Sequence, residues 1–117
     1  MKYLCLVYME QQTMDALSPG EGTTLTRESL AYDRELERGG HFIVANALQP
    51  TSAATTVRVR NGRISTTDGP FAETKEQLGG YYLIEARDLN DAIQVASRIP
   101  SAKIGSVEVR PIMMFDQ

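Results

Sequence analysis

Apolar and polar residues alternate along this chain with two different periods, and the period distinguishes expected strands from expected helices. Lys2 to Met9 is dense in aromatic and aliphatic residues and holds no turn residue, which predicts a strand. Three further strands are expected at residues 41–48, 80–86 and 106–114. Strand geometry then places alternate residues of the last one on opposite faces: Val107 and Val109 on one, Glu108 and Arg110 on the other.

A β hairpin is predicted in the middle of the chain. Two short segments, Thr55 to Arg60 and Arg63 to Thr67, are rich in β-branched residues or alternate with polar ones. They flank Asn61-Gly62, and Asn-Gly between two such segments is the strongest local hairpin signal.

A first helix is expected after the polar connection that follows the opening strand. Ser18, Pro19 and Glu21 match the capping signature of a helix start, but two glycines weaken that turn, so we expect regular helix from about Thr24 to the Gly39-Gly40 pair. Its mostly apolar stripe is expected to comprise Leu25, Ser29, Tyr32 and Leu36. The opposite face is expected to be solvated, with Arg27, Asp33, Arg34, Glu37 and Arg38.

A second helix is expected between Asp88 and Pro100. Asp88 is a good N-cap, because its carboxylate can accept a hydrogen bond from an unpaired amide of the first turn. Pro100 lacks an amide donor and is expected to end the helix. The predicted buried stripe is Leu89, Ala92, Ile93 and Ala96.

The order of these elements predicts an α+β fold. Without the hairpin the order is β-α-β-β-α-β, the ferredoxin-like arrangement, which places both helices on one face of an antiparallel sheet. The strand segments YLCLVYM and GYYLI carry apolar side chains on both faces, so the second face should also be covered. We expect a second copy of the chain, in a two-fold homodimer, to cover it.

Composition limits the class of protein. A length of 117 residues suits one domain, spanning 1–117. The net charge of −3, with scattered basic residues, argues against a nucleic-acid partner. We expect no membrane association and a cytoplasmic location, because the apolar segments are short and no signal-peptide pattern is seen. Cys5 lies within an apolar segment and is expected to act as a small buried hydrophobe.

One long stretch resembles a known family. Asp68-Gly69-Pro70-Phe71, then Ala72 to Glu76 and Gln77-Leu78-Gly79-Gly80-Tyr81-Tyr82, is similar to the signature of the YCII-related family in its DGPF-domain branch. The similarity continues from Ala47 to Ile112, and the opening MKYLCLVY fits as well.

The resemblance implies a dimeric α/β-barrel fold but little about activity. Proteins of this family are mostly of unassigned activity, and a His and Asp pair facing the cleft between helix and sheet has been suggested as their active site. In this chain Ser29 takes the expected position of that histidine, and Asn46 stands where relatives more often have glycine and an acid.

Asp68 is the candidate catalytic residue. Its carboxylate could simply fix the Asp-Gly-Pro turn by accepting amide hydrogen bonds. Alternatively, the turn could aim it into the cleft beside Phe71, where partial burial would raise its pKa toward that of a general base.

Four further residues are candidates for ligand binding: Phe71, Lys75, His41 and Arg110. His41 is the only histidine, so no metal centre is expected, and no phosphate-binding glycine loop or other cofactor motif is found. Two hypotheses follow. The chain is either a dimeric module that binds a small anionic or polar-aromatic ligand or a regulatory partner near the DGPF turn, or a cofactor-independent enzyme acting on a small organic acid or lactone with Asp68 as general base.

Overall fold

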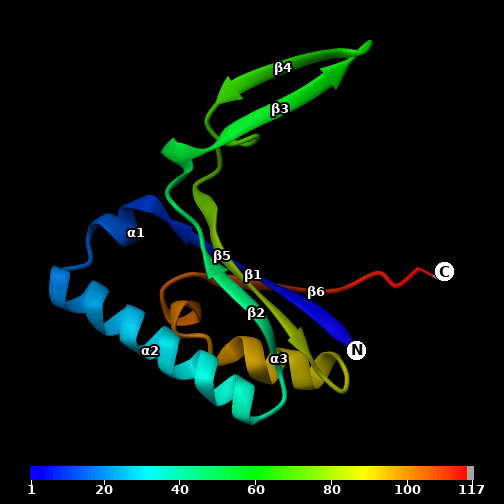
Figure 1. Cartoon of the computed structure of the whole chain (residues 1–117). Helices are drawn as coiled ribbons and strands as arrows, with labels where there is room; N and C mark the ends of the chain where they lie inside the picture. The colour runs from blue at the N-terminus through cyan, green and yellow to red at the C-terminus, as the bar shows by residue number, and fades with distance from the viewer. Residues whose placement is uncertain (116–117) are drawn as a thin grey trace.

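A four-stranded antiparallel sheet forms the centre of the protein (Figure 1). The computed structural model describes residues 1–115. The sheet has the strand order β2-β5-β1-β6. Its strands are β1 (Lys2–Glu10), β2 (Phe42–Ala47), β5 (Glu76–Glu85) and β6 (Ser106–Pro111). This order confirms the ferredoxin-like α+β arrangement expected from the sequence.

Helices α2 (Pro19–Arg38) and α3 (Leu89–Ser97) pack on one face of this sheet. Their buried side chains join a single core cluster with alternate residues of β1, which are Tyr3, Cys5, Val7 and Met9. The Tyr32 hydroxyl donates a 2.6 Å hydrogen bond to the carbonyl of Val95, which ties α2 to α3 inside the core. Cys5 is fully buried as expected, and burial raises the pKa of its thiol to about 11.

The start of α2 differs from the sequence-based expectation. Both bonds of a capping box are present: the Glu21 amide donates to Ser18 Oγ at 3.1 Å, and the Ser18 amide donates to Glu21 Oε1 at 2.9 Å. The helix therefore begins at Pro19 rather than near Thr24, because the capping box offsets the two early glycines. Its C-cap is Gly39, as expected.

Four other local expectations are corrected by the structure. The polar connection after β1 contains a short helix, α1 (Gln11–Asp15), and β5 begins at Glu76 rather than Gly80. Helix α3 ends at Ser97, and Pro100 instead opens the short 3₁₀ helix η2 (Pro100–Lys103). The buried stripe of α3 consists of Ala92, Val95 and Ala96, while Leu89 and Ile93 are exposed.

A hairpin projects away from this body. Strands β3 (Thr55–Arg60) and β4 (Arg63–Asp68) pair only with each other, and a 3₁₀ turn, η1 (Thr51–Ala53), precedes them. Asn61 and Gly62 both have positive φ, which is the conformation that the predicted two-residue turn requires. We call residues 55–68 the arm, and Figure 1 shows it standing clear of the sheet and the helices.

Candidate functional site

A cavity of about 400 Å³ lies between α2 and the sheet. We call it the helix–sheet cavity. Residues of α1, α2, β1, β2 and β5 line it, and most of these side chains are apolar, including Met9, Met14, Leu25 and Leu30. The polar side chains that reach it from α2 and β5 include Ser29, Asp33 and Tyr82. A largely apolar wall with a few polar groups is typical of small-molecule sites.

Asp33 is the most unusual group in this cavity. Its Oδ1 atom is buried and has no hydrogen-bond partner among the described residues. Burial raises the pKa of the Asp33 carboxyl, and the interaction with the Tyr82 hydroxyl reduces part of that rise. Burial, together with the nearby Asp33 charge, raises the pKa of Tyr82, so this phenol stays protonated. The pair thus places a carboxylate and a hydroxyl donor at one wall.

The position of Asp33 corrects the sequence analysis, which placed it on the solvated face of α2. Leu25, Ser29 and Asp33 are separated by four residues each, so the three side chains lie on one face of the helix. This four-residue spacing is the sequence pattern that could have placed Asp33 beside the apolar stripe of α2. The Ser29 hydroxyl is already used, because it donates to the Leu25 carbonyl at 2.8 Å.

The floor of the cavity is formed where chain segments leave for the arm and return from it. The Leu48 amide donates to the Gly79 carbonyl at 2.9 Å, and both residues line the cavity. At Gly80 a Cβ atom would lie 3.0 Å from the Asn46 carbonyl oxygen, so a side chain there would press on β2. The glycine thus lets the two strands approach closely beside the cavity.

Asp68 and Phe71 lie at the root of the arm. Asp68 is exposed and pairs across the hairpin with Thr55. The next residue, Gly69, has a φ of 102°, and its amide donates to the Ala54 carbonyl at 2.8 Å. The Phe71 ring is 77% exposed and lies under the Arg58 guanidinium, 5.5 Å from its centre. Within one chain, the DGPF stretch therefore fastens the base of the hairpin.

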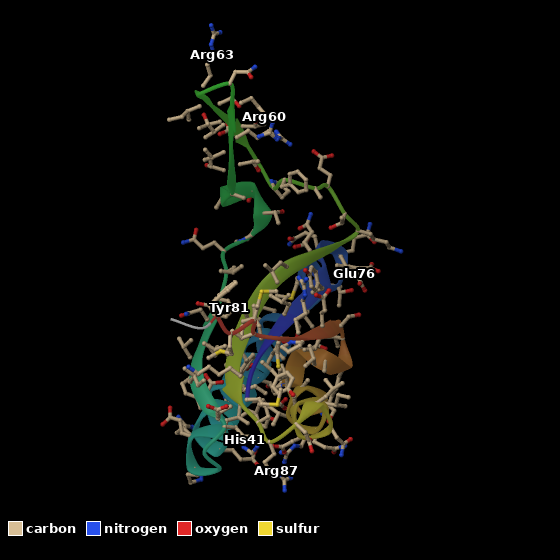
Figure 2. The ribbon with its side chains drawn as sticks, turned by 90° about the vertical axis from the view of Figure 1, so that its right-hand side faces the viewer. His41, Arg60, Arg63, Glu76, Tyr81 and Arg87 are labelled. Atoms are coloured by element: carbon tan, nitrogen blue, oxygen red, sulfur yellow. The ribbon has the colours of Figure 1, made fainter. Side chains whose placement is uncertain are left out.

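The other three candidate residues each lie beside a different carboxylate. His41 Nε2 lies 3.4 Å from Asp91 Oδ2, and Arg110 Nε lies 3.4 Å from Glu108 Oε2. Lys75 Nζ lies 3.6 Å from Glu10 Oε1, beside a hollow of about 620 Å³ at the ends of β1 and β6. The structure does not bring these side chains together with Asp68, and none of them lines the helix–sheet cavity. Figure 2 shows His41 at the end of the molecule opposite the arm.

That hollow at the ends of β1 and β6 is larger than the helix–sheet cavity but chemically weaker as a site. Its charged groups are Glu10, Lys75, Glu76 and Glu108, which lie near the surface. In the part of the chain from residue 1 to 115, no three His, Cys, Asp or Glu residues gather in a way that could hold a metal ion. No helix in that part is long and apolar enough to cross a membrane.

Comparison with known proteins identifies the family. The chain is 38% identical to an uncharacterized protein of Rhizobium meliloti (strain 1021), over 98% of this chain and 94% of that protein. The model of the YCII-related domain matches residues 1–116. Since the match spans nearly the whole chain, this protein belongs to the YCII-related family.

Proposed function

We propose that this protein is a homodimeric small-molecule-binding protein whose ligand occupies the helix–sheet cavity. The observation that carries the proposal is the buried, unpartnered Oδ1 of Asp33. Leaving a buried acceptor unpaired costs roughly 1–3 kcal/mol, so a native protein keeps one where something pairs with it. A ligand in the cavity supplies that partner.

The lining defines the chemistry of the ligand. A volume of about 400 Å³ is at the small end of the range of ligand pockets. Met14, Leu25 and Leu30 favour an apolar or aromatic body, and Asp33 favours an N–H or O–H donor. Of the two ligand types expected from the sequence, this lining favours the polar-aromatic one over an anion, because a carboxylate repels an anion.

The dimer is supported by the sheet face that the helices leave uncovered. Alternate residues of β1 and β5 give this face a mostly apolar, half-buried surface, formed by Leu4, Leu6, Tyr8, Tyr81 and Leu83. Val107 and Val109 pack toward the helices, so Glu108 and Arg110 lie at the edge of the same uncovered face. A second copy related by a two-fold axis would bury the apolar patch and keep the charged pair at the rim.

A second candidate function is cofactor-independent catalysis on a small organic acid or lactone. Its support is the raised pKa of Asp33, which moves this carboxyl toward the range of a general base, with the Tyr82 hydroxyl beside it. Asp68, the base expected from the sequence, is exposed within one chain. The catalytic role of Asp68 stays a prediction, and the experiment below tests it. The cytoplasmic location also stays a prediction.

The test is a thermal-shift screen with small phenols, lactones and monocarboxylic acids, on wild type, Asp33→Asn and Asp68→Asn. A compound at one hundred times its dissociation constant stabilises the native state by roughly 2.7 kcal/mol. We expect hits whose shift is lost in Asp33→Asn and retained in Asp68→Asn. A shift that survives in Asp33→Asn would place the ligand elsewhere, and loss only in Asp68→Asn would return the site to the DGPF turn.

Two further measurements separate the parts of the proposal. Sedimentation equilibrium at micromolar concentration should give a dimer, and a monomer would contradict the role of the uncovered sheet face. Any acid or lactone that binds should then be incubated with the protein and followed by mass spectrometry. Turnover that disappears in Asp33→Asn would favour the enzyme, whereas an unchanged compound supports the binding protein.

A further inference from the structure

The arm has two chemically different faces. Cross-strand partners share a face, so Val57, Val59 and Ile64 lie together on what we call the apolar face of the arm. Arg58, Arg60 and Arg63 lie on the opposite, basic face. The three apolar side chains are 60%, 56% and 75% exposed. Figure 2 shows Arg60 and Arg63 at the far tip, away from the body.

Within residues 1–115, the arm has little packing from its own chain beyond its root, where Arg58 lies over Phe71. Every residue of β4 is exposed, and β3 and β4 form a separate two-stranded sheet. An isolated two-stranded hairpin is at best marginally stable in water, and clustered exposed apolar residues mark contact surfaces. The projecting arm therefore has the composition of a docking element.

Charge indicates what the arm docks on. Three arginines and Asp68 give residues 55–68 a net charge of +2, and the rest of the chain, with nine basic and fourteen acidic residues, carries −5. No salt bridge within residues 1–115 involves Arg58, Arg60 or Arg63. A basic arm and an acidic body are complementary between two copies of the same chain.

We propose that the arm docks on the body of a second copy, so that each protomer of the dimer holds the other with its hairpin. The apolar face packs on the partner, and the long arginine side chains reach round the edges of the two-stranded arm to carboxylates at the rim of that contact. This inference rests on the homodimer of the proposed function and adds to it a second contact besides the sheet face. A polyanion such as nucleic acid is a poorer occupant, because it would leave the apolar face exposed and the whole chain is negative.

The test compares dimer dissociation constants from sedimentation equilibrium. The arm variant is Val59→Ser with Ile64→Ser, and the matched control is Leu89→Ser with Ile93→Ser, which changes two exposed apolar residues of α3. We expect the arm variant to dissociate about tenfold more readily, as for central interface residues, and the control to match wild type. Circular dichroism checks that each variant is folded.

A charge variant keeps the proposal open to refutation if the first variant unfolds. Arg60→Glu with Arg63→Glu should also weaken the dimer, and raising the salt from about 0.05 to 0.5 M should weaken wild type more than this variant. A wild-type dimer that neither arm variant weakens overturns the arm contact and leaves the dimer standing. A wild-type monomer overturns both. Binding of a single-stranded oligonucleotide that only the charge variant loses, with an unchanged dimer, would assign the arm to a polyanion.

Discussion

The body and the arm of this protein are built from similar strand residues but reach their stability by different routes. In the body, Cys5, Leu36 and Ile84 are at most 2% exposed, within one core shared by the sheet and both helices. In the arm, Val57, Val59 and Ile64 are more than half exposed. The helix-facing side of the body buries its apolar residues within one chain, whereas the apolar residues of the arm are exposed. β-Branched sequence alone therefore does not distinguish a core strand from an exposed one.

The largest expected difference is in the loss of unfolding free energy when one large apolar side chain is truncated to alanine in each region. Leu36→Ala should cost about 3 kcal/mol of unfolding free energy, because it leaves a cavity between α2 and the sheet. Ile64→Ala should cost less than about 1 kcal/mol, because this side chain is 75% exposed. Urea titrations at one low protein concentration measure both. Equal losses would mean that the arm packs within its own chain.

The root of the arm should show the next largest effect. Gly69→Ala forces a side chain into a φ of 102°, at a cost of roughly 1–2 kcal/mol. Because Gly69 closes only the hairpin, we expect amide hydrogens of β3 and β4 to exchange about tenfold faster while those of β1 and β5 keep their rates. Hydrogen exchange followed by NMR checks this, and equal acceleration in both sheets would show that arm and body unfold together.

The cavity predicts a pH-dependent effect in the body. Burial raises the pKa of folded Asp33 above its unfolded value, so its favourable contribution is present at low pH and is lost as the pH rises through the folded pKa. Asp33→Asn should therefore stabilise the protein by roughly 1 kcal/mol at pH 7, since a neutral amide is easier to bury than a carboxylate. The gain should vanish below the unfolded pKa of an aspartate, about 4, because the carboxyl is then protonated in both the folded and the unfolded states.

Thermal unfolding of wild type and Asp33→Asn measures this effect. A range of about pH 3 to 8 covers the titration of carboxyl groups. Asp68→Asn is the matched control, because Asp68 is exposed on the arm and no similar gain is expected. A gain independent of pH would assign the effect to packing instead of charge.

The smallest prediction is a gain of stability in α2. Gly22 lies within the helix, and a Cβ atom there would meet nothing within 4 Å. Gly22→Ala should stabilise the body by about 0.5–1 kcal/mol, since alanine loses less conformational freedom in a helix. Thermal unfolding measures this gain. Gly22→Ala in the body and Gly69→Ala in the arm also compare the effect of the same substitution in the two regions. A loss of stability would show that the early turn of α2 needs its glycine.

The sequence predicted the strands, the hairpin and the fold class because period and turn chemistry are local properties. It missed α1, since a helix of five residues is too short to show a helical period. It chose Leu89 and Ile93 for the buried stripe of α3 where Val95 is buried, because the rotation of a short helix on a sheet is decided by tertiary packing.

The candidate site was harder to predict than the fold. A carboxylate beside the apolar stripe of α2 resembles a solvated residue in sequence. The side chain that interacts with it, Tyr82, is 49 positions further along the sequence and enters from β5. Asp68 is conspicuous in the sequence because it is an acid directly before Gly-Pro. In the structure Asp68 lies at the turn that closes the hairpin. Local sequence cannot distinguish an acid at such a turn from an acid that lines a cleft.

The hydrogen bond between Leu48 and Gly79 joins the two segments that connect the arm to the body. The same two segments are also part of the wall of the helix–sheet cavity, so any displacement of the arm would be transmitted to that wall. If each protomer grips the other, ligand affinity and dimer affinity become linked, and by thermodynamic reciprocity each strengthens or weakens the other by the same factor. Small-molecule concentration would then set the fraction of assembled protein.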